Sequence, residues 1–418
     1  MAETNSKRFH EKDREDRIRT VKEFSGLSED EAEILRGNDG ISFGEADHMV
    51  ENVIGTMAFP LGIGTNFRIN GRDYLVPMVI EESSVIAAAS KAAKIARKHG
   101  GFSMESDESY SIGQIQVVGV NPRTAIPKVL RASKTILKLA NSKSKTLSQM
   151  KKGAKKVTCK RLETKSGPML IVELLIDVGD AMGANVTNTM CEGVAPLIEE
   201  ITGGRVILRI LSNYSTRRLV RGKAVFDKEE VGGSKVVADI IHAYNFAAND
   251  PYRAVTHNKG VMNGIIAVAN ATGQDTRAME AAAHAFASKG GIYTSLTTWK
   301  KDKAGNLVGS IEVPMPVGIV GGIINVHPMI RVCLKILGVK SAGELGCVIG
   351  AVGLAQNFSA IRALASEGIQ KGHMRLHAKN IAISAGVPKE KVHEVAQKMI
   401  QENNVSVGRA REMLESGN

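Results

Sequence analysis

The chain has 418 residues, of which 43% are hydrophobic and 4% aromatic, and its formal net charge is +12 at pH 7. This length suits two or three domains, and so few aromatic rings disfavour a stacking platform for single-stranded nucleic acid. The positive charge favours an anionic partner, which leaves nucleic acid, a membrane surface and a phosphorylated small molecule as candidates.

The first clear secondary-structure pattern predicts a helix over residues 28–36. Ser28 and Glu31 have the spacing of a capping box, and Gly37 follows as a stop signal. The next stretch, residues 46–71, starts with a helical pattern and then breaks up at its proline and glycines.

Residues 72–101 predict a strand, a short turn and a long alanine-rich helix that ends at paired glycines. Glu81 and Glu82 lie at the junction, directly after the apolar strand. One interpretation turns at least one of these carboxyls toward the interior, where a buried carboxyl can hold a proton at neutral pH. The alternative is a pair of carboxylates at a helix start, which the helix dipole favours.

The region 110–215 alternates between strand and helix patterns, with strands at 111–120, 167–178 and 205–215 and a helix within 179–204. This pattern predicts one compact α+β domain that interrupts the surrounding chain. The region also holds the densest basic stretch, SKSKTLSQMKKGAKK at 142–156. That stretch is either a solvated helix face and loop or a phosphate-binding segment.

Neither of the common glycine-rich nucleotide loops, GxGxxG and GxxxxGK[ST], occurs in the required context. The best candidate for a dinucleotide site is LLIDVGDAMGANVTNTM (174–190), where a buried strand leads through small residues into a helix. A helix N-terminus presents unpaired N–H groups and a positive dipole end, which suit a pyrophosphate. The alternative is a tight packing turn with Asp180 as the N-cap.

A second candidate segment, residues 249–286, collects polar side chains among small residues: Arg253, His257, Lys259, Asn263 and Asp275. Lys259 lies in a run too polar for a core and too rich in glycine for an ordinary surface helix. A lysine buried beside carboxylates can stabilise a developing oxyanion. The alternative is a loop with solvated charges.

A third candidate segment, EGIQKGHMRLHAKN (367–380), places His373 and His377 four residues apart. A metal site would need a third ligand, and none is evident, so no metal is expected. A general-acid histidine is the favoured interpretation, because histidine titrates near neutral pH. An exposed pair on a basic face is the alternative.

The remaining signals concern the C-terminus and the cellular location. Residues 392–400 have the apolar spacing of an amphipathic helix in a small C-terminal unit. The cysteines, at 159, 191, 333 and 347, form no CxxC pair, and the charged N-terminus lacks the apolar region of a signal peptide. The longest mostly apolar run, residues 313–326, is too short to span a bilayer. We expect a cytoplasmic protein without a membrane anchor.

Several longer stretches, in this order, resemble the class II hydroxymethylglutaryl-CoA reductases of bacteria and archaea. They are ENVIGT (51–56), VPMVIEESSVIAAAS (76–90), DVGDAMGANVTNTM (177–190), ITGGRVILRILSN (201–213), DPYRAVTHNKGVMNG (250–264), ATGQD (271–275), SLTTW (295–299) and VGLAQNFSAIRALASEGIQKGHM (352–374). The implied activity is the four-electron reduction of (S)-3-hydroxy-3-methylglutaryl-CoA to mevalonate and CoA with two NAD(P)H.

Three alternatives to this activity remain open. The first is the same catalyst running in the mevalonate-degrading direction, and the second is another CoA-thioester oxidoreductase. The third is a basic nucleic-acid-binding protein, which the absence of a helix-turn-helix or RRM pattern disfavours.

The resemblance implies a role for each matching residue. The expected catalytic residues are Glu82, Lys259, Asp275 and His373. The residues expected to bind the hydroxymethylglutaryl group and its surroundings are Ser84, Arg253, Asn263 and Asn357. The residues expected to bind the cofactor are Ser144, Asp180, Ala181, Met182, Gly183, Ala184, Asn185 and Asn213.

These residue types suit two hydride transfers. Lys259 would neutralise the charge that grows on the thioester oxygen, and His373 would protonate the departing CoA thiolate. Glu82 would protonate the oxygen of mevaldehyde in the second step. Asp275, expected between Lys259 and Glu82, would keep the lysine charged and help to hold the glutamate protonated.

NADPH is the expected cofactor, with NADH as the alternative. One type of family member carries an aspartate at the corresponding place, which takes the adenosine ribose hydroxyls. Here Ser144 stands between Lys143 and Lys145. A carboxylate would repel a 2′-phosphate, whereas a serine flanked by lysines accepts it.

The resemblance also implies an α+β architecture. A large α/β substrate domain would comprise residues 1–109 and 216–372, with an inserted, non-Rossmann, ferredoxin-like dinucleotide-binding domain at 110–215. A C-terminal helical flap at 373–418 would close over the substrates. The family's active site lies between subunits, so the expected assembly is a homodimer or a larger assembly of dimers.

Overall fold

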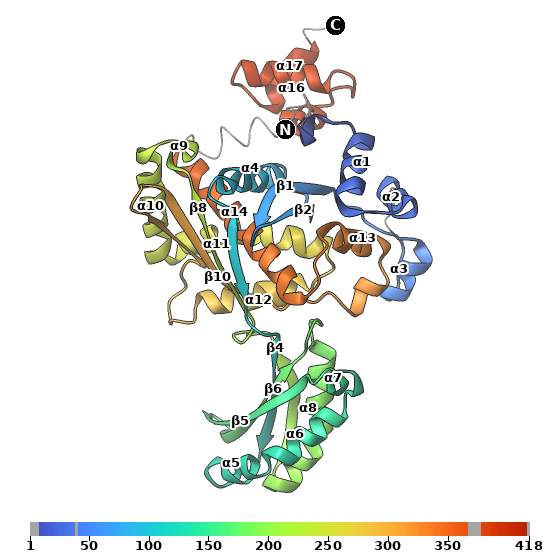
Figure 1. The fold of residues 1–418 in the computed structure, drawn as a ribbon, viewed down its shortest axis with the longest axis vertical. Coiled ribbons are helices and arrows are strands. Elements are labelled where there is room, and N and C mark those ends of the chain that lie inside the picture. The colour runs from blue at the N-terminus through green and yellow to red at the C-terminus, as the bar shows by residue number, and fades with distance from the viewer. Residues whose placement is uncertain (1–7, 38–40, 367–377, 416–418) are drawn as a thin grey trace.

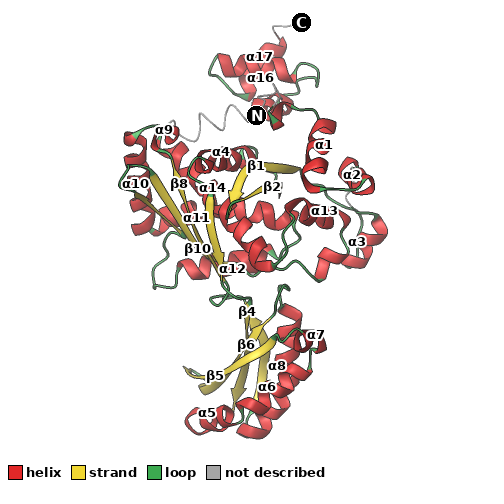
Figure 2. Cartoon of the chain, viewed as in Figure 1, coloured by secondary structure: helices red, strands yellow, loops and turns green. Residues whose placement is uncertain are grey.

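The structure is a computed structural model that describes residues 8–37, 41–366 and 378–415. The chain forms two bodies, each built on a sheet of its own, and a small helical unit near the C-terminus (Figure 1). Helices gather around the strands of the larger body and along one side of the smaller sheet (Figure 2). This mixed helix-and-sheet architecture confirms the predicted fold class.

The larger body is built on a six-stranded sheet with the order β2-β1-β3-β8-β10-β9. Its strands are β1 (Leu61–Ile69), β2 (Arg72–Val79), β3 (Phe102–Ser106), β8 (Leu219–Phe226), β9 (Thr297–Lys301) and β10 (Leu307–Pro314). Strand β1 differs from the irregular segment predicted there. It forms because Asn70 and Gly71, with φ of +50° and +82°, make a tight turn that pairs β1 with β2.

The helices of the larger body pack around this sheet. They are α4 (Val85–Arg97), α9 (Lys228–Val231), α10 (Ser234–Asn249), α11 (Pro251–Ala271), α12 (Thr276–Ala287), η2 (Gly322–Asn325), α13 (Pro328–Leu337) and α14 (Ala342–Ala365). Among the described residues, α14 alone has the length and apolar composition of a membrane span. Of the stretch that meets this criterion, 72% is buried inside the protein, which is typical of a core helix.

Helix α11 carries Lys259, for which a loop was one interpretation. The helix begins where Asp250 Oδ1 accepts a hydrogen bond from Arg253 N at 2.7 Å, with a proline at its first position. Its glycines serve helix packing: a Cβ added to Gly264 would lie 2.8 Å from the carbonyl oxygen of Val352 on α14. The close contact between the two helices therefore holds Lys259 on a regular scaffold.

The smaller body has a four-stranded antiparallel sheet with the order β5-β6-β4-β7. Its elements are β4 (Tyr110–Val118), α5 (Pro122–Arg131), α6 (Ser133–Ser142), α7 (Lys145–Gln149), β5 (Gly153–Thr164), β6 (Gly167–Asp177), α8 (Ala184–Thr202) and β7 (Arg205–Ser212). The end of the basic stretch forms the start of β5, which the sequence did not indicate. The buried residues of the smaller body form a separate hydrophobic cluster, and all of them lie between Ile115 and Val206 in the sequence.

The termini form short helices. Near the N-terminus lie η1 (Phe9–Glu11), α1 (Arg14–Ser25), α2 (Glu29–Arg36) and α3 (Phe43–Met49). The predicted capping box of Ser28 and Glu31 is confirmed, and Gly37 is the C-cap. The C-terminal unit contains α16 (Val392–Gln401) and α17 (Val407–Glu415) around a core of its own.

Candidate active site

Three predicted site residues meet between the end of β2 and helix α11. Lys259 Nζ lies 3.0 Å from Glu82 Oε2, and Asn263 Nδ2 donates to the same oxygen at 3.2 Å. Lys259 and Asn263 are four residues apart on α11, so they share one helix face. The side chains of Lys259 and Glu82 are 61% and 28% exposed. An ammonium and a carboxyl thus lie side by side within reach of a ligand, as acid–base chemistry on a carbonyl requires.

The junction that carries Glu82 contains a strained residue. Ser84, the N-cap of α4, has φ +82° and ψ −28°, a left-handed conformation that L side chains rarely adopt. Its side chain makes no capping hydrogen bond to the helix. Strained conformations of this kind cluster at functional sites. The sharp turn brings Glu82 back toward α11 directly after the buried strand.

Asp275 lies at the start of α12 and, in the described chain, forms no hydrogen bond or ion pair with Lys259 or Glu82. Its Oδ1 accepts from Ala278 N at 3.1 Å, which caps the helix, and lies 3.2 Å from Arg277 Nη2. Aspartate is a preferred N-cap residue, and this local bond turns its side chain toward its own helix. The expected three-residue contact is therefore absent from the described conformation.

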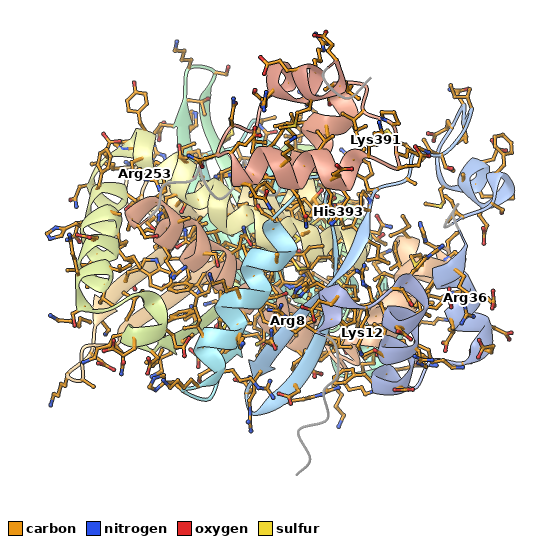
Figure 3. The ribbon with its side chains drawn as sticks, turned by 90° about the horizontal axis from the view of Figure 1, so that it is seen from above. Arg8, Lys12, Arg36, Arg253, Lys391 and His393 are labelled. Carbon is orange, nitrogen blue, oxygen red and sulfur yellow. The ribbon has the colours of Figure 1, made fainter. Side chains whose placement is uncertain are left out.

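Arg253 presents a guanidinium that contacts no acidic side chain of the described residues. It lies in the first turn of α11, and burial lowers its pKa. Figure 3 shows Arg253 near one edge of the view and Arg36 of the N-terminal helices near the other. A half-buried guanidinium without a protein anion is suited to a carboxylate or phosphate on a ligand.

Asn357 lies in the core, although the sequence suggests a substrate contact. It is 1% exposed, and its Oδ1 accepts from Thr297 Oγ1 and from Trp299 Nε1, both at 2.9 Å. Its Nδ2 donates to the carbonyl oxygen of His257 at 3.2 Å. Burial and the charge of Arg253 lower the pKa of His257 to about 4. In the described conformation Asn357 ties α14 to α11 and β9.

The turn at residues 180–185 leads from β6 into α8. Gly183 is the N-cap of α8, with φ +98°, and no side chain caps the helix. Within the described chain, the first N–H groups of α8 are therefore available to an anion. Lys152, in the basic stretch, lies 3.0 Å from Asp177 at the end of β6, and this hydrogen bond raises the pKa of Lys152. The turn and this lysine fit a dinucleotide phosphate.

The other predicted cofactor residues lie elsewhere on the smaller body or beside it. Ser144 is the N-cap of α7, where its Oγ accepts from Leu147 N at 3.3 Å. Asn213 follows β7, and its carbonyl accepts from Ser215 N at 2.9 Å. His373, the predicted general acid, and its neighbour His377 lie outside the described residues.

The structure places three further side chains near the site that the sequence did not indicate. Gln356 Oε1 is buried without a hydrogen-bond partner in the described chain, close to α11 at Gly264. Gln274 and Arg218 bind backbone atoms around the 180–185 turn. The glutamine within the apolar stretch 345–358 was a usable signal for Gln356. No local pattern distinguishes Arg218 from the other arginines of STRRLVR.

Comparisons with known proteins identify the family of the chain. The sequence profile of the hydroxymethylglutaryl-coenzyme A reductase family matches residues 13–378. A 3-hydroxy-3-methylglutaryl-coenzyme A reductase from Archaeoglobus fulgidus is 52% identical over 97% of this chain and 93% of its own length. A probable reductase of the same name from Borreliella burgdorferi is 36% identical over 90% of this chain and 86% of its own.

Solved structures extend this similarity to the fold. The class II reductase from Streptococcus pneumoniae, bound to NADPH in open conformations, matches with a TM-score of 0.82 and 38% identity. The match covers 97% of this chain and 99% of that one. The resemblance that the motifs predicted is confirmed, and the chain belongs to the hydroxymethylglutaryl-coenzyme A reductase family, in its class II branch, as an oxidoreductase of the mevalonate pathway.

Proposed function

We propose that this reductase reduces its thioester substrate with NADPH and that Glu82 and Lys259 act at the reacting carbonyl. The observation that carries the proposal is the 3.0 Å contact between Lys259 Nζ and Glu82 Oε2, with Asn263 on the same oxygen. A cation and a proton donor adjacent to each other can serve both reductions without rearrangement of the backbone.

The chain's own residues manage charge and protons while bound NADPH supplies the hydride. Lys259 neutralises the oxyanion that grows as the thioester carbonyl is reduced. Glu82 protonates the oxygen of mevaldehyde in the second reduction, and His373 protonates the CoA thiolate. Asp275 joins this group by giving up its contact with Arg277, whose side chain is 85% exposed, and its N-cap bond to Ala278 N, which together cost about 1 kcal/mol. The reverse, mevalonate-oxidising direction uses the same groups.

Arg253 binds the carboxylate of the hydroxymethylglutaryl group, and Ser84 contributes a hydroxyl. The support for this assignment is the half-buried guanidinium without an acidic partner in the described chain. An arginine can hold a carboxylate with two parallel hydrogen bonds, which fixes the orientation of the carbonyl relative to Lys259. Arg253 and Ser84 thus fix the position of the acyl group in the site.

The dinucleotide binds across the smaller body, which we assign to residues 110–215, with its pyrophosphate at the N-terminus of α8. Ala181, Met182, Gly183 and Ala184 shape the turn, and Asn213 borders it. Ser144 and its flanking lysines accept the 2′-phosphate. The NADPH-bound relative from Streptococcus pneumoniae supports this choice of cofactor.

Ser144→Asp tests the cofactor preference. We expect kcat/KM with NADPH to fall about tenfold or more, because a carboxylate repels the 2′-phosphate, while kcat/KM with NADH changes little. The measurement is steady-state oxidation of both cofactors with hydroxymethylglutaryl-CoA. Thr146→Asp on the same short helix is the control. A wild-type enzyme that works much better with NADH would contradict the preference.

The reductase acts as a cytoplasmic homodimer, or an assembly of dimers, that pairs through the segment 50–59. This segment has no helix or strand, and its apolar side chains are exposed: Val50, Ile54, Met57 and Phe59. Ile54 is 100% and Met57 80% exposed, which is unfavourable for a free surface. A second copy would cover these side chains.

Ile54→Asp combined with Met57→Asp tests the dimer. We expect sedimentation to shift from dimer to monomer and turnover to fall with it, because two buried charges oppose association. The melting temperature of the monomer should change little, since both side chains are exposed in the single chain. Ile292→Asp, at a side chain that is 70% exposed outside the segment, should remain dimeric. A dimeric double variant would contradict this interface.

A further inference from the structure

A single buried arginine occupies the junction between the two bodies. Arg218 is the residue before β8, on the return connection from β7, and it is 5% exposed. The outgoing connection lies beside it, because Asp107 N donates to the carbonyl of Leu219 at 2.8 Å. The two segments that connect the bodies, from β3 to β4 and from β7 to β8, therefore both pass next to Arg218.

The guanidinium of Arg218 binds backbone carbonyls rather than a carboxylate. Nη1 donates to the carbonyl of Met182 at 2.7 Å, and Nη2 donates to that of Ala181 at 3.0 Å and to that of Val317. Ser109 Oγ lies 3.5 Å from Nη2. Burial lowers the pKa of Arg218 to about 10, so the group stays charged at neutral pH. Two of the three carbonyls belong to the 180–185 turn, and the third belongs to the larger body.

The same turn is tied to the larger body at several other points. Asp180 accepts from Ile319 N through its carbonyl and from Ala342 N, in the first turn of α14, through Oδ1, both at 2.8 Å. Gly318 packs so closely that an added Cβ would lie 2.5 Å from Met182 N. These contacts hold the turn against residues 317–320.

The segment 317–320 leads on to the catalytic region. Gln274 Nε2 donates to the carbonyl of Gly318 at 2.9 Å, and Gly318 N donates to Gln274 Oε1 at 2.9 Å. Gln274 precedes Asp275 at the start of α12. A continuous set of hydrogen bonds therefore runs from the turn, through Arg218 and residues 317–320, to the turn that carries Asp275.

We propose that Arg218 is a positioning residue that holds the cofactor turn in register with the catalytic side chains, an inference that rests on the proposed binding of the dinucleotide at this turn. With its carbonyls drawn toward the guanidinium, the turn keeps a fixed orientation at the N-terminus of α8. The buried positive charge also favours the anionic pyrophosphate. Arginine is required because one planar fork reaches three carbonyls, whereas a lysine ammonium has a single nitrogen.

The test compares Arg218→Lys with the matched variant Arg221→Lys. Arg221 lies at the same junction but pairs with Asp107 at 2.6 Å and does not contact the turn. We expect Arg218→Lys to raise the dissociation constant of NADPH, measured calorimetrically without acyl-CoA, by about tenfold through loss of preorganising hydrogen bonds. The KM for hydroxymethylglutaryl-CoA should stay within about twofold, because its site keeps its contacts. Arg221→Lys should change neither value.

Two further variants distinguish a failure of the positioning role of Arg218 from a failure of the proposed cofactor turn. Gly318→Ala places a methyl group against the 180–185 turn and leaves Arg218 unchanged. It should raise the NADPH dissociation constant without changing the KM for hydroxymethylglutaryl-CoA. This variant tests the proposal even if Arg218→Lys is unstable. Asn185→Asp adds a negative charge to the first turn of α8, which suits the helix dipole but repels a pyrophosphate. If Asn185→Asp weakens NADPH and both Arg218→Lys and Gly318→Ala do not, the positioning role is wrong. If Asn185→Asp has no effect, the proposed cofactor turn is wrong, and the role of Arg218 falls with it.

Discussion

Lys259→Ala should lower kcat for hydroxymethylglutaryl-CoA reduction by about 10³-fold, or about 4 kcal/mol of transition-state stabilisation. The hydride adds negative charge to an oxygen that no other cation of the Glu82–Lys259–Asn263 group can neutralise. The fold should persist, because the side chain is 61% exposed and alanine is a good helix former at this position of α11. Stopped-flow oxidation of NADPH gives kcat, and circular dichroism checks the fold.

Lys98→Ala is the matched control for Lys259→Ala. Lys98 is also a lysine paired with a carboxylate, since its Nζ lies 3.1 Å from Asp227 Oδ2, and its side chain is 55% exposed. It lies outside the site, so its replacement should leave kcat unchanged. A Lys259→Ala enzyme with turnover within about tenfold of the wild type would overturn the proposed electrostatic role.

Glu82→Gln should lower the rate of mevaldehyde reduction by about 10³-fold, because it removes the proton donor of the second step. Glutamine has the same shape, and its amide oxygen can still accept from Asn263 Nδ2, so the junction between β2 and α4 should stay folded. The measurement uses mevaldehyde and NADPH directly, which isolates the second reduction from the thioester step.

The neighbouring Glu81→Gln provides the control, because Glu81 is exposed and makes no hydrogen bond to Lys259. We expect its rate to remain near that of the wild type. If Glu82→Gln slows the thioester step and leaves mevaldehyde reduction intact, the proton is supplied by another group. If both glutamine variants are equally slow, the assignment to the second glutamate of the pair is wrong.

The sequence predicted local elements well where the signal itself is local. The capping box at Ser28 and the strand–turn–helix at 72–101 depend on neighbouring residues, and both are present. Strands β1, β3, β5, β8 and β9 were missed. For β1 and β5 the reason is that a glycine-rich strand and a lysine-rich strand form only when a partner strand pairs with them. Pairing is a property of the sheet and leaves little trace in composition.

Among the site residues, the sequence determined the chemical types but did not determine their contacts. The structure brings Glu82, Lys259 and Asn263 into direct contact, although Asp275 was expected between the first two. Asp275 instead bonds to its own helix, and Asn357 is enclosed by Thr297 and Trp299. The catalytic and cofactor roles of the residues stay predictions that the variants above can test. The motifs gave no means of separating a ligand contact from a buried hydrogen bond, since both favour the same polar side chains.

What the sequence by itself determined was the family and the absence of a standard glycine-rich nucleotide loop, and it predicted a set of candidate reactive side chains. The tertiary structure alone decided that Asn357 supports the core and that Arg218 joins the 180–185 turn to the larger body. The physical reason is that a motif records which groups are present along the chain. Burial and hydrogen-bond partners depend instead on segments far apart in sequence, such as residues 182, 218 and 317, and these meet only when the two bodies are assembled.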